Sequence, residues 1–199
     1  MTSSRPNPSN RIQNRLQVLV LRHPREKGVE LASVPVLEES IAHITVRTGL
    51  SWPNLAKAVG HIADPKRWAV LFLGSLKGPA LEEIKKAPQG TVLISTRNGE
   101  LLSAKEARLE GIIVLDGNWS QAKALWWRNA WMLKLNRLLL KPAQPSQYGK
   151  LRREPRRQCL SSLESVAEVL EHIEENPTAA EELRARFKAM LEARRSRPA

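Results

Sequence analysis

Apolar residues along this chain gather in short continuous runs separated by polar segments. Four of these runs have the length of a β-strand: residues 16–21, 68–73, 91–95 and 111–115. Continuous apolar runs are typical of strands buried on both faces, as in parallel sheets. Segments with helical spacing of apolar residues lie between and beside them, near residues 35–43, 53–60, 79–86 and 103–109. The alternation predicts an α/β fold, a mainly parallel sheet with helices on both faces.

The last third of the chain has the pattern of two further helices. Ser161 and Glu164 have the spacing of a capping box, and apolar residues follow at helical intervals. After Pro177, Thr178 and Glu181 have the same spacing and predict the start of a second helix. We therefore expect a basic, disordered arm over residues 1–15, one main domain over residues 16–176, and a C-terminal helix with a basic tail over residues 177–199.

The charge of the chain indicates a polyanionic partner. The 199 residues include 32 Lys and Arg against 20 Asp and Glu, a net charge of +12. Residues 116–160 alone carry ten basic and two acidic residues, together with four of the six tryptophans. Basic and aromatic residues together suit a surface that neutralises phosphates and stacks on unpaired bases. The alternative interpretation is a solvated basic face over a tryptophan-rich core.

Other features of the composition exclude several classes of protein. The single cysteine, Cys159, excludes an internal disulfide framework and a zinc site built from several thiolates, and the four histidines have no ligand spacing. No apolar run approaches the roughly 18 residues of a membrane span, and the first fifteen residues lack the apolar segment of a signal peptide. These observations favour a cytoplasmic protein with no metal and no membrane partner. We expect a monomer or a homodimer.

The most specific local pattern follows the last predicted strand. That strand runs directly into Asp116, then Gly117, then Asn118, which is a good residue to begin a helix. Ligands of open α/β sheets collect at the carboxyl ends of the strands, so Asp116 occupies a position typical of a site residue. A purely structural role, in which Asp116 and Asn118 turn the chain and cap the helix, fits the local pattern equally well.

A second pattern lies downstream, where Tyr148–Pro155 (YGKLRREP) is followed by Leu160-Ser161-Ser162-Leu163-Glu164. A basic loop here leads into a helix N-terminus, whose free N–H groups and dipole can hold a carboxylate or a phosphate. A soluble loop before an ordinary capped helix is the alternative.

Together, these patterns resemble the DTW-domain family. The family's strand-ending Asp-x-Thr/Ser-Trp corresponds to Asp116-Gly117-Asn118-Trp119, its Tyr-x-Leu-Arg-x-x-Pro to residues 148–155, and its Leu-Ser-Thr-x-Glu-Ala to residues 160–165. Upstream, residues 22–26 (RHPRE) resemble the His-Pro-x-Glu element, and Leu73-Gly74-Ser75 takes the place of the Pro-Gly loop. The likeness covers about residues 17–173. Two departures are Asn118 in place of Thr or Ser and the absence of an N-terminal cysteine cluster.

The resemblance implies a tRNA-uridine aminocarboxypropyltransferase with a SPOUT-like fold and a C-terminal trefoil knot. Such an enzyme transfers the 3-amino-3-carboxypropyl group of S-adenosylmethionine to N3 of a uridine in tRNA and releases 5′-methylthioadenosine. The alternatives are a SPOUT-type S-adenosylmethionine-dependent RNA methyltransferase, an enzyme acting on rRNA rather than tRNA, and a non-catalytic RNA-binding protein.

Candidate residues follow from position and resemblance. Uracil N3 is a poor nucleophile while it carries its proton, so the reaction needs a base, and Asp116 is the candidate. By resemblance, the donor pocket would be lined by Ser33, Trp119 and Ala122 and, largely through backbone groups, by Leu73, Gly74, Leu115, Leu140, Tyr148 and Ser162. The basic residues that we expect to contact RNA are Arg128, Lys134, Arg152, Arg153, Arg156 and Arg157. Trp126, Trp127 and Trp131 cannot all face inwards from one helix, so at least one should be exposed or should cover a neighbouring element.

Overall fold

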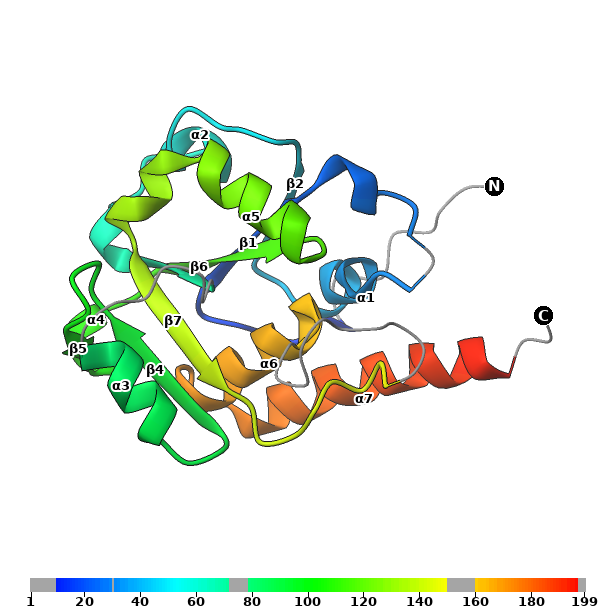
Figure 1. The fold of residues 1–199 in the computed structure, drawn as a ribbon. Coiled ribbons are helices and arrows are strands. Elements are labelled where there is room, and N and C mark those ends of the chain that lie inside the picture. The colour runs from blue at the N-terminus through cyan, green and yellow to red at the C-terminus, as the bar shows by residue number, and fades with distance from the viewer. Residues whose placement is uncertain (1–9, 30, 72–78, 150–159, 197–199) are drawn as a thin grey trace.

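In a computed structural model of the chain, residues 10–29, 31–71, 79–149 and 160–196 are described, and they form one seven-stranded sheet with helices on both faces (Figure 1). The strand order is β2-β1-β6-β3-β7-β4-β5. The first five strands in this order are parallel, and β4 and β5 run antiparallel to their neighbours. The strands are β1 (Gln17–Arg22), β2 (Ile44–Thr48), β3 (Trp68–Leu71), β4 (Thr91–Ser95), β5 (Leu101–Leu102), β6 (Gly111–Asp116) and β7 (Asn136–Lys141).

The helices divide between the two faces of the sheet, as Figure 1 shows with α1, α6 and α7 on one side and α2 and α5 on the other. They are α1 (Ser33–Ser40), α2 (Leu55–Val59), α3 (Pro79–Lys86), α4 (Ala104–Ala107), α5 (Trp119–Arg128), α6 (Ser162–His172) and α7 (Pro177–Arg195). Short 3-10 segments are η2 (Pro24–Glu26), η3 (Pro65–Arg67) and η4 (Ala130–Lys134). None of the helices in the described ranges is long and apolar enough to cross a membrane.

Alternation along the central strand β6 builds two hydrophobic cores. Ile112 and Val114 pack with the residues of α1, α6 and α7, whereas Ile113 and Leu115 pack with those of α2 and α5. All four side chains are buried, which explains the continuous apolar run in the sequence. The next residue in the alternation, Asp116, therefore emerges on the α6 side of the sheet.

The structure confirms the mainly parallel α/β sheet and four of its strands, and it adds strands that the apolar runs did not predict. The strand β7 was missed because only three leucines lie between Arg137 and Lys141. The strand β2 was missed because it is half exposed and carries polar residues. The SPOUT-like relationship and the trefoil knot stay predictions, and residues 150–159 lie outside the described part of the chain.

The ends of the chain differ from our expectation. Residues 10–15 are not a free arm, because Ile12 is buried and bridges to Ile41, and the Asn14 side chain donates to the backbone carbonyl oxygens of Leu16 and His43. The helix α7 begins one residue before the predicted cap, since the Asn176 side chain caps it.

The C-terminal helix also belongs to the main core. The helix α7 packs against α6 and α1 through buried Leu183, Phe187 and Leu191. The expected boundary between residues 176 and 177 therefore does not separate two packing units.

Candidate functional site

The candidate site is built where two neighbouring parallel strands end. The strand β1 ends at Arg22 and β6 ends at Asp116, and these two residues are partners in the register of the strand pair. Both follow valines, Val20 and Val114, that lie two positions earlier and pack in the core of the α6 face. Because side chains alternate along a strand, Arg22 and Asp116 are presented together to the start of α6.

Asp116 is held from two directions. One carboxylate oxygen, Oδ2, lies 3.1 Å from Nε of Arg22, and the other, Oδ1, accepts a hydrogen bond of 2.9 Å from the Ser162 hydroxyl. Ser162 is the first residue of α6, whose capping box joins Ser161 to Glu164 as the sequence predicted. Asp116 is 7% exposed, so both oxygens are largely withdrawn from water. The arrangement fixes the orientation of the carboxylate.

Burial sets the basicity of this carboxylate. Desolvation raises the pKa of Asp116 above its ordinary value, and the negative charge of Glu26 adds to the rise. The hydrogen bond from Ser162 and the positive charge of Arg22 act in the opposite direction but do not cancel the effect of burial. A carboxylate with a raised pKa accepts a proton more readily than an exposed aspartate does.

Arg22 was not among the residues predicted to form the site. Within the described residues, its Nη2 atom is buried and has no hydrogen-bond partner. The Nε of Arg22 donates to Asp116, and Nη2 is a second donor that this contact does not use. A buried donor without a partner is costly, and an anionic ligand would satisfy it. The missed signal is that Arg22 ends β1 as Asp116 ends β6, which becomes visible only when the two strands are known to pair.

The turn between β6 and α5 brings the helix close to the strand end. A Cβ added at Gly117 would lie 2.7 Å from Cβ of Gln121, so only glycine fits without a shift. Asn118 caps α5 by accepting from the backbone N–H of Gln121, whose side chain in turn accepts from the Asn118 N–H. The predicted capping role of Asn118 is confirmed. Trp119, the next residue, is 40% exposed.

The other residues predicted to line the donor pocket have varied surroundings. Leu115 and Ala122 are buried in the core beneath α5, Ser33 is buried at the start of α1, and Leu140 is partly buried on β7. Leu73 and Gly74 lie outside the described residues. Within the described part of the chain, the structure shows only Ser162 of this set in hydrogen-bond contact with Asp116.

Tyr148 lies in the hydrophobic core. It is 2% exposed, its hydroxyl donates to the Leu31 carbonyl oxygen at 2.5 Å, and its ring meets that of Phe187 edge-on with centroids 5.1 Å apart. A role for its side chain in lining an open pocket does not fit these contacts, so only its backbone could face a ligand.

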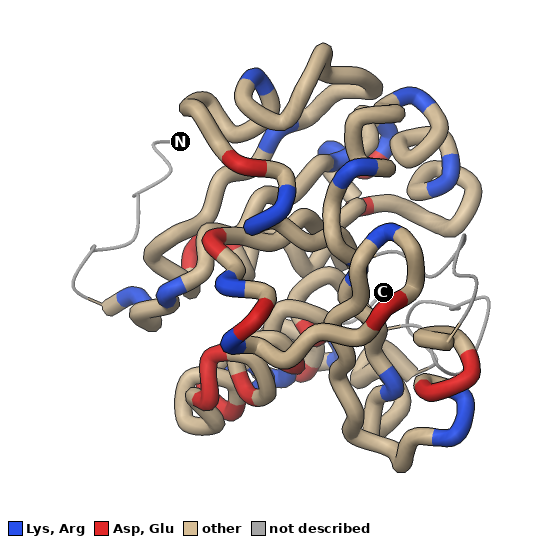
Figure 2. Tube along the Cα trace, turned by 90° about the vertical axis from the view of Figure 1, so that its left-hand side faces the viewer, with Lys and Arg blue, Asp and Glu red and all other residues tan. Residues whose placement is uncertain are grey.

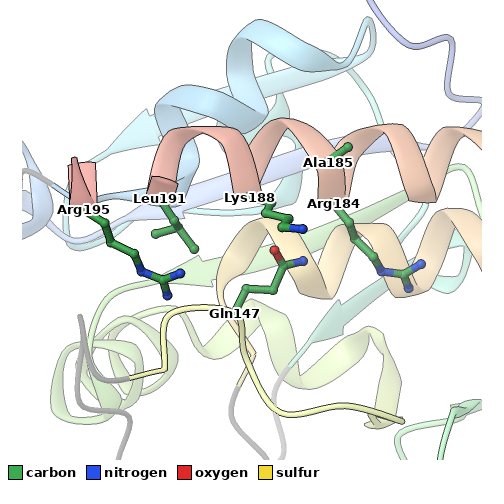
Figure 3. A pocket seen from close by; sticks show the side chains of 6 residues that line it. All are labelled: Gln147, Arg184, Ala185, Lys188, Leu191 and Arg195. Carbon is green, nitrogen blue, oxygen red and sulfur yellow. The ribbon is translucent and has the colours of Figure 1, made fainter. Parts of the chain in front are cut away.

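One surface pocket lies away from the predicted residues. It has a volume of about 380 Å³ and is lined by Gln147 and side chains of α7, as Figure 3 shows. The lining includes Arg184, whose charge is shared with Glu168 and Glu171 at 2.8 and 2.6 Å. None of the predicted site residues lines this pocket, and we assign it no part in the site.

Two of the six residues predicted to contact RNA can be placed. Arg128 at the end of α5 and Lys134 in η4 are both exposed. The other four, Arg152, Arg153, Arg156 and Arg157, lie outside the described residues.

Arg137, one of the basic residues in the stretch 116–160, has a structural role. Its guanidinium is buried, lies 4.8 Å from the ring centroid of Trp126 and donates to the carbonyl oxygens of Leu135 and Met132. Burial lowers the pKa of this guanidinium to about 10. Not all of the positive charge in residues 116–160 is therefore available to a polyanion.

The described residues contain no group of three or more His, Cys, Asp or Glu side chains placed to hold a metal ion.

The fold and the site define an α/β protein with its candidate chemistry at the carboxyl ends of parallel strands, the usual ligand position in open sheets. Comparison with protein families matches residues 1–195 to the DTW domain. The chain belongs to the DTW-domain family.

Three curated relatives carry the name tRNA-uridine aminocarboxypropyltransferase 2. The Mus musculus protein is 27% identical over 179 residues, covering 88% of this chain and 54% of the relative. The Drosophila melanogaster protein is 26% identical over 176 residues, covering 86% and 61%, and the Macaca fascicularis protein is 24% identical over 175 residues, covering 85% and 51%. The chain thus spans between about half and three fifths of the length of these relatives. No solved structure matches the chain.

Proposed function

We propose that this protein transfers the 3-amino-3-carboxypropyl group of S-adenosylmethionine to N3 of a uridine in tRNA and releases 5′-methylthioadenosine. Membership of the DTW-domain family and the names of the three relatives support this reaction class. The observation that carries the proposal is the buried Asp116 carboxylate, which Arg22 and Ser162 hold at the end of β6.

The residues at this edge suit the amino acid portion of the donor. The Nη2 of Arg22, which has no hydrogen-bond partner among the described residues, matches a carboxylate group, which an arginine recognises with charge-assisted hydrogen bonds. The N-terminus of α6 begins beside Asp116 and adds the positive end of its dipole to the same place. Both features favour a ligand with a carboxylate over a neutral one. When bound, S-adenosylmethionine supplies a carbon activated by a sulfonium leaving group.

Asp116 has the properties that the acceptor base requires. It accepts the proton from N3 of the uracil ring, and the freed electron pair on N3 forms a bond to the terminal carbon of the aminocarboxypropyl group. The carbon–sulfur bond breaks with its electrons moving to sulfur, which leaves as a neutral thioether. Charge and atoms balance, because the proton remains on Asp116 until water removes it. The main tasks of the protein are the alignment of the two substrates and this proton transfer.

A methyltransferase would use the same donor and differ only in which carbon faces the uridine. The test is therefore a comparison of two labelled forms of S-adenosylmethionine, one labelled in the aminocarboxypropyl carbons and one in the methyl group, each incubated with bulk tRNA. We expect the first label alone to enter the RNA. Transfer from the methyl form would establish the methyltransferase instead. Parallel reactions with rRNA distinguish the two proposed substrates.

A further inference from the structure

A row of exposed side chains runs along α5 away from the end of β6. Trp119, Lys123 and Trp127 follow one another at intervals of four residues, so they lie on the same side of the helix. Trp119 is 40% exposed, Trp127 is 74% exposed, and Lys123 is exposed between them. We refer to these three residues as the α5 stripe. Eight residues of helix separate its two ends by about 12 Å.

The packing of α5 does not account for Trp127. The buried side of the helix consists of Ala122, Leu125 and Trp126. Trp131, in the segment that follows, is partly buried and donates its indole N–H to the Trp52 carbonyl oxygen at 2.9 Å. Trp127 instead presents most of its ring to water. This exposure confirms that the tryptophans near the end of the helix do not all face inwards, and a large exposed aromatic side chain is typical of a contact surface.

The surroundings of the stripe are basic. The neighbouring segments, residues 44–63 and 117–134, contain no acidic residue and five basic ones, all exposed: Arg47, Lys57, Lys123, Arg128 and Lys134. On the opposite face of the sheet, α1, α6 and α7 together contain eight glutamates against five lysines and arginines, all five of them in α7. In Figure 2 most of the acidic segments lie in the lower half of the view, whereas basic segments lie in both halves. The α5 face is therefore complementary to a polyanion, and the opposite face is not.

The chemistry of the partner follows from combining these features. Aromatic faces stack on bases whose own faces are accessible, which requires unpaired nucleotides, while lysines and arginines neutralise the phosphates between them. A regular RNA duplex would be recognised through its phosphates and 2′-hydroxyls and would leave Trp127 without a role. N3 of uracil is itself a base-pairing position, so the reacting uridine must also be unpaired. The stripe begins three residues after Asp116, in the helix that follows β6, so it starts at the carboxyl edge of the sheet where Asp116 lies.

We propose that the α5 stripe binds a single-stranded RNA segment beside the modified uridine, with one base stacked on Trp127 and the adjacent phosphates contacting Lys123 and Arg128. This inference rests on the proposed function for the identity of RNA as substrate. It adds the structural class of the substrate, an unpaired loop or end, and the residues that select it.

The test compares binding of a fluorescent oligouridine and of an RNA duplex of equal length, with no donor present. Removing a stacking partner costs about 1–3 kcal/mol per base, so Trp127→Ala should weaken oligouridine binding about 5- to 150-fold, while Trp127→Phe keeps most of the affinity. Duplex binding should change little in either variant. Lys123→Ala should lower the slope of affinity against salt by about one, because one phosphate contact is lost.

Lys188→Ala on α7 is the matched control, because Lys188 is also exposed and lies on the helix layer of the opposite face. It should leave oligouridine binding and its salt slope unchanged. Equal affinity of wild type and Trp127→Ala for oligouridine, or equal losses for oligouridine and duplex, would overturn the proposal. A change of oligomeric state in Trp127→Ala without a change in oligouridine binding would likewise overturn it and assign Trp127 to a protein interface.

The result is separable from the proposed function. If Trp127→Ala loses oligouridine binding and the wild-type protein transfers no aminocarboxypropyl group, the RNA-binding role of the α5 stripe is supported and the proposed reaction is refuted. Transfer by wild type with unchanged binding in Trp127→Ala would refute the stripe and leave the reaction standing.

Discussion

Arg22 and Asp116 end two adjacent parallel strands in register, and the guanidinium Nε lies 3.1 Å from the carboxylate Oδ2. The pair is partly shielded from water, with 12% and 10% of the two side chains exposed. The sheet therefore holds an acidic and a basic group together where ligands of open α/β folds bind.

Asp116→Asn should reduce turnover by about 10²–10⁴-fold, the usual contribution of a general base. The amide keeps the shape of the side chain and can still contact Ser162, so donor binding measured by calorimetry should remain. Glu39→Gln, an exposed carboxyl on α1, is the control and should react like wild type. If Asp116→Asn turned over at the wild-type rate, Asp116 would be a structural cap.

The pH dependence of kcat/KM should show the raised pKa of Asp116. The base must be ionised, and burial moves its pKa upward, so activity should fall on the acid side at a higher pH than an ordinary aspartate would allow. Ser162→Ala removes a hydrogen bond that lowers this pKa, and the acid limb should move to still higher pH. An acid limb that stays in place in Ser162→Ala would show that another group titrates.

Arg22→Ala should weaken binding of S-adenosylmethionine about 10- to 150-fold, because a hydrogen bond to a charged group is worth about 1.5–3 kcal/mol. Isothermal calorimetry gives the affinity, and a thermal melt verifies that the variant folds. Arg22→Lys keeps the charge without the fork of donors and should fall between wild type and Arg22→Ala. Wild-type donor affinity in a folded Arg22→Ala protein would remove Arg22 from the donor site.

Gly117→Ala should destabilise the fold by about 1–3 kcal/mol in chemical denaturation, since the added methyl group overlaps Gln121 and displaces the start of α5. Ser120→Ala, an exposed position in the first turn of the same helix, is the control and should stay within about 0.5 kcal/mol of wild type. A Gly117→Ala protein as stable as the control would mean that the turn relaxes freely.

Much of this arrangement could be predicted from residue patterns. The buried run 111–115 followed by Asp116 indicated both the central strand β6 and the candidate base, and the spacing of Ser161 and Glu164 indicated the start of α6. Those features are local, because burial of a strand on both faces and capping of a helix each produce a residue pattern only a few positions long.

The rest depended on contacts between distant segments. Arg22 became part of the site because β1 pairs with β6 across 94 residues, and no local pattern specifies that pairing. Arg137 is one of the ten basic residues in the stretch 116–160, but carbonyl oxygens and the ring of Trp126 hold it inside the protein. The exposure of Trp127 and burial of Trp126 likewise depend on where α5 meets the sheet. Tertiary packing decided each of these outcomes.

The central claim concerns the group that reaches the RNA, and mass spectrometry of nucleosides tests it most directly. Transfer RNA is incubated with S-adenosylmethionine and either wild type or Asp116→Asn, digested to nucleosides and analysed. We predict a uridine carrying the 3-amino-3-carboxypropyl group at N3 with wild type, and at least 100-fold less of it at equal time with Asp116→Asn, the lower end of the roughly 10²–10⁴-fold range for a base. A methylated nucleoside, or tRNA left unmodified by the wild-type protein, would contradict it.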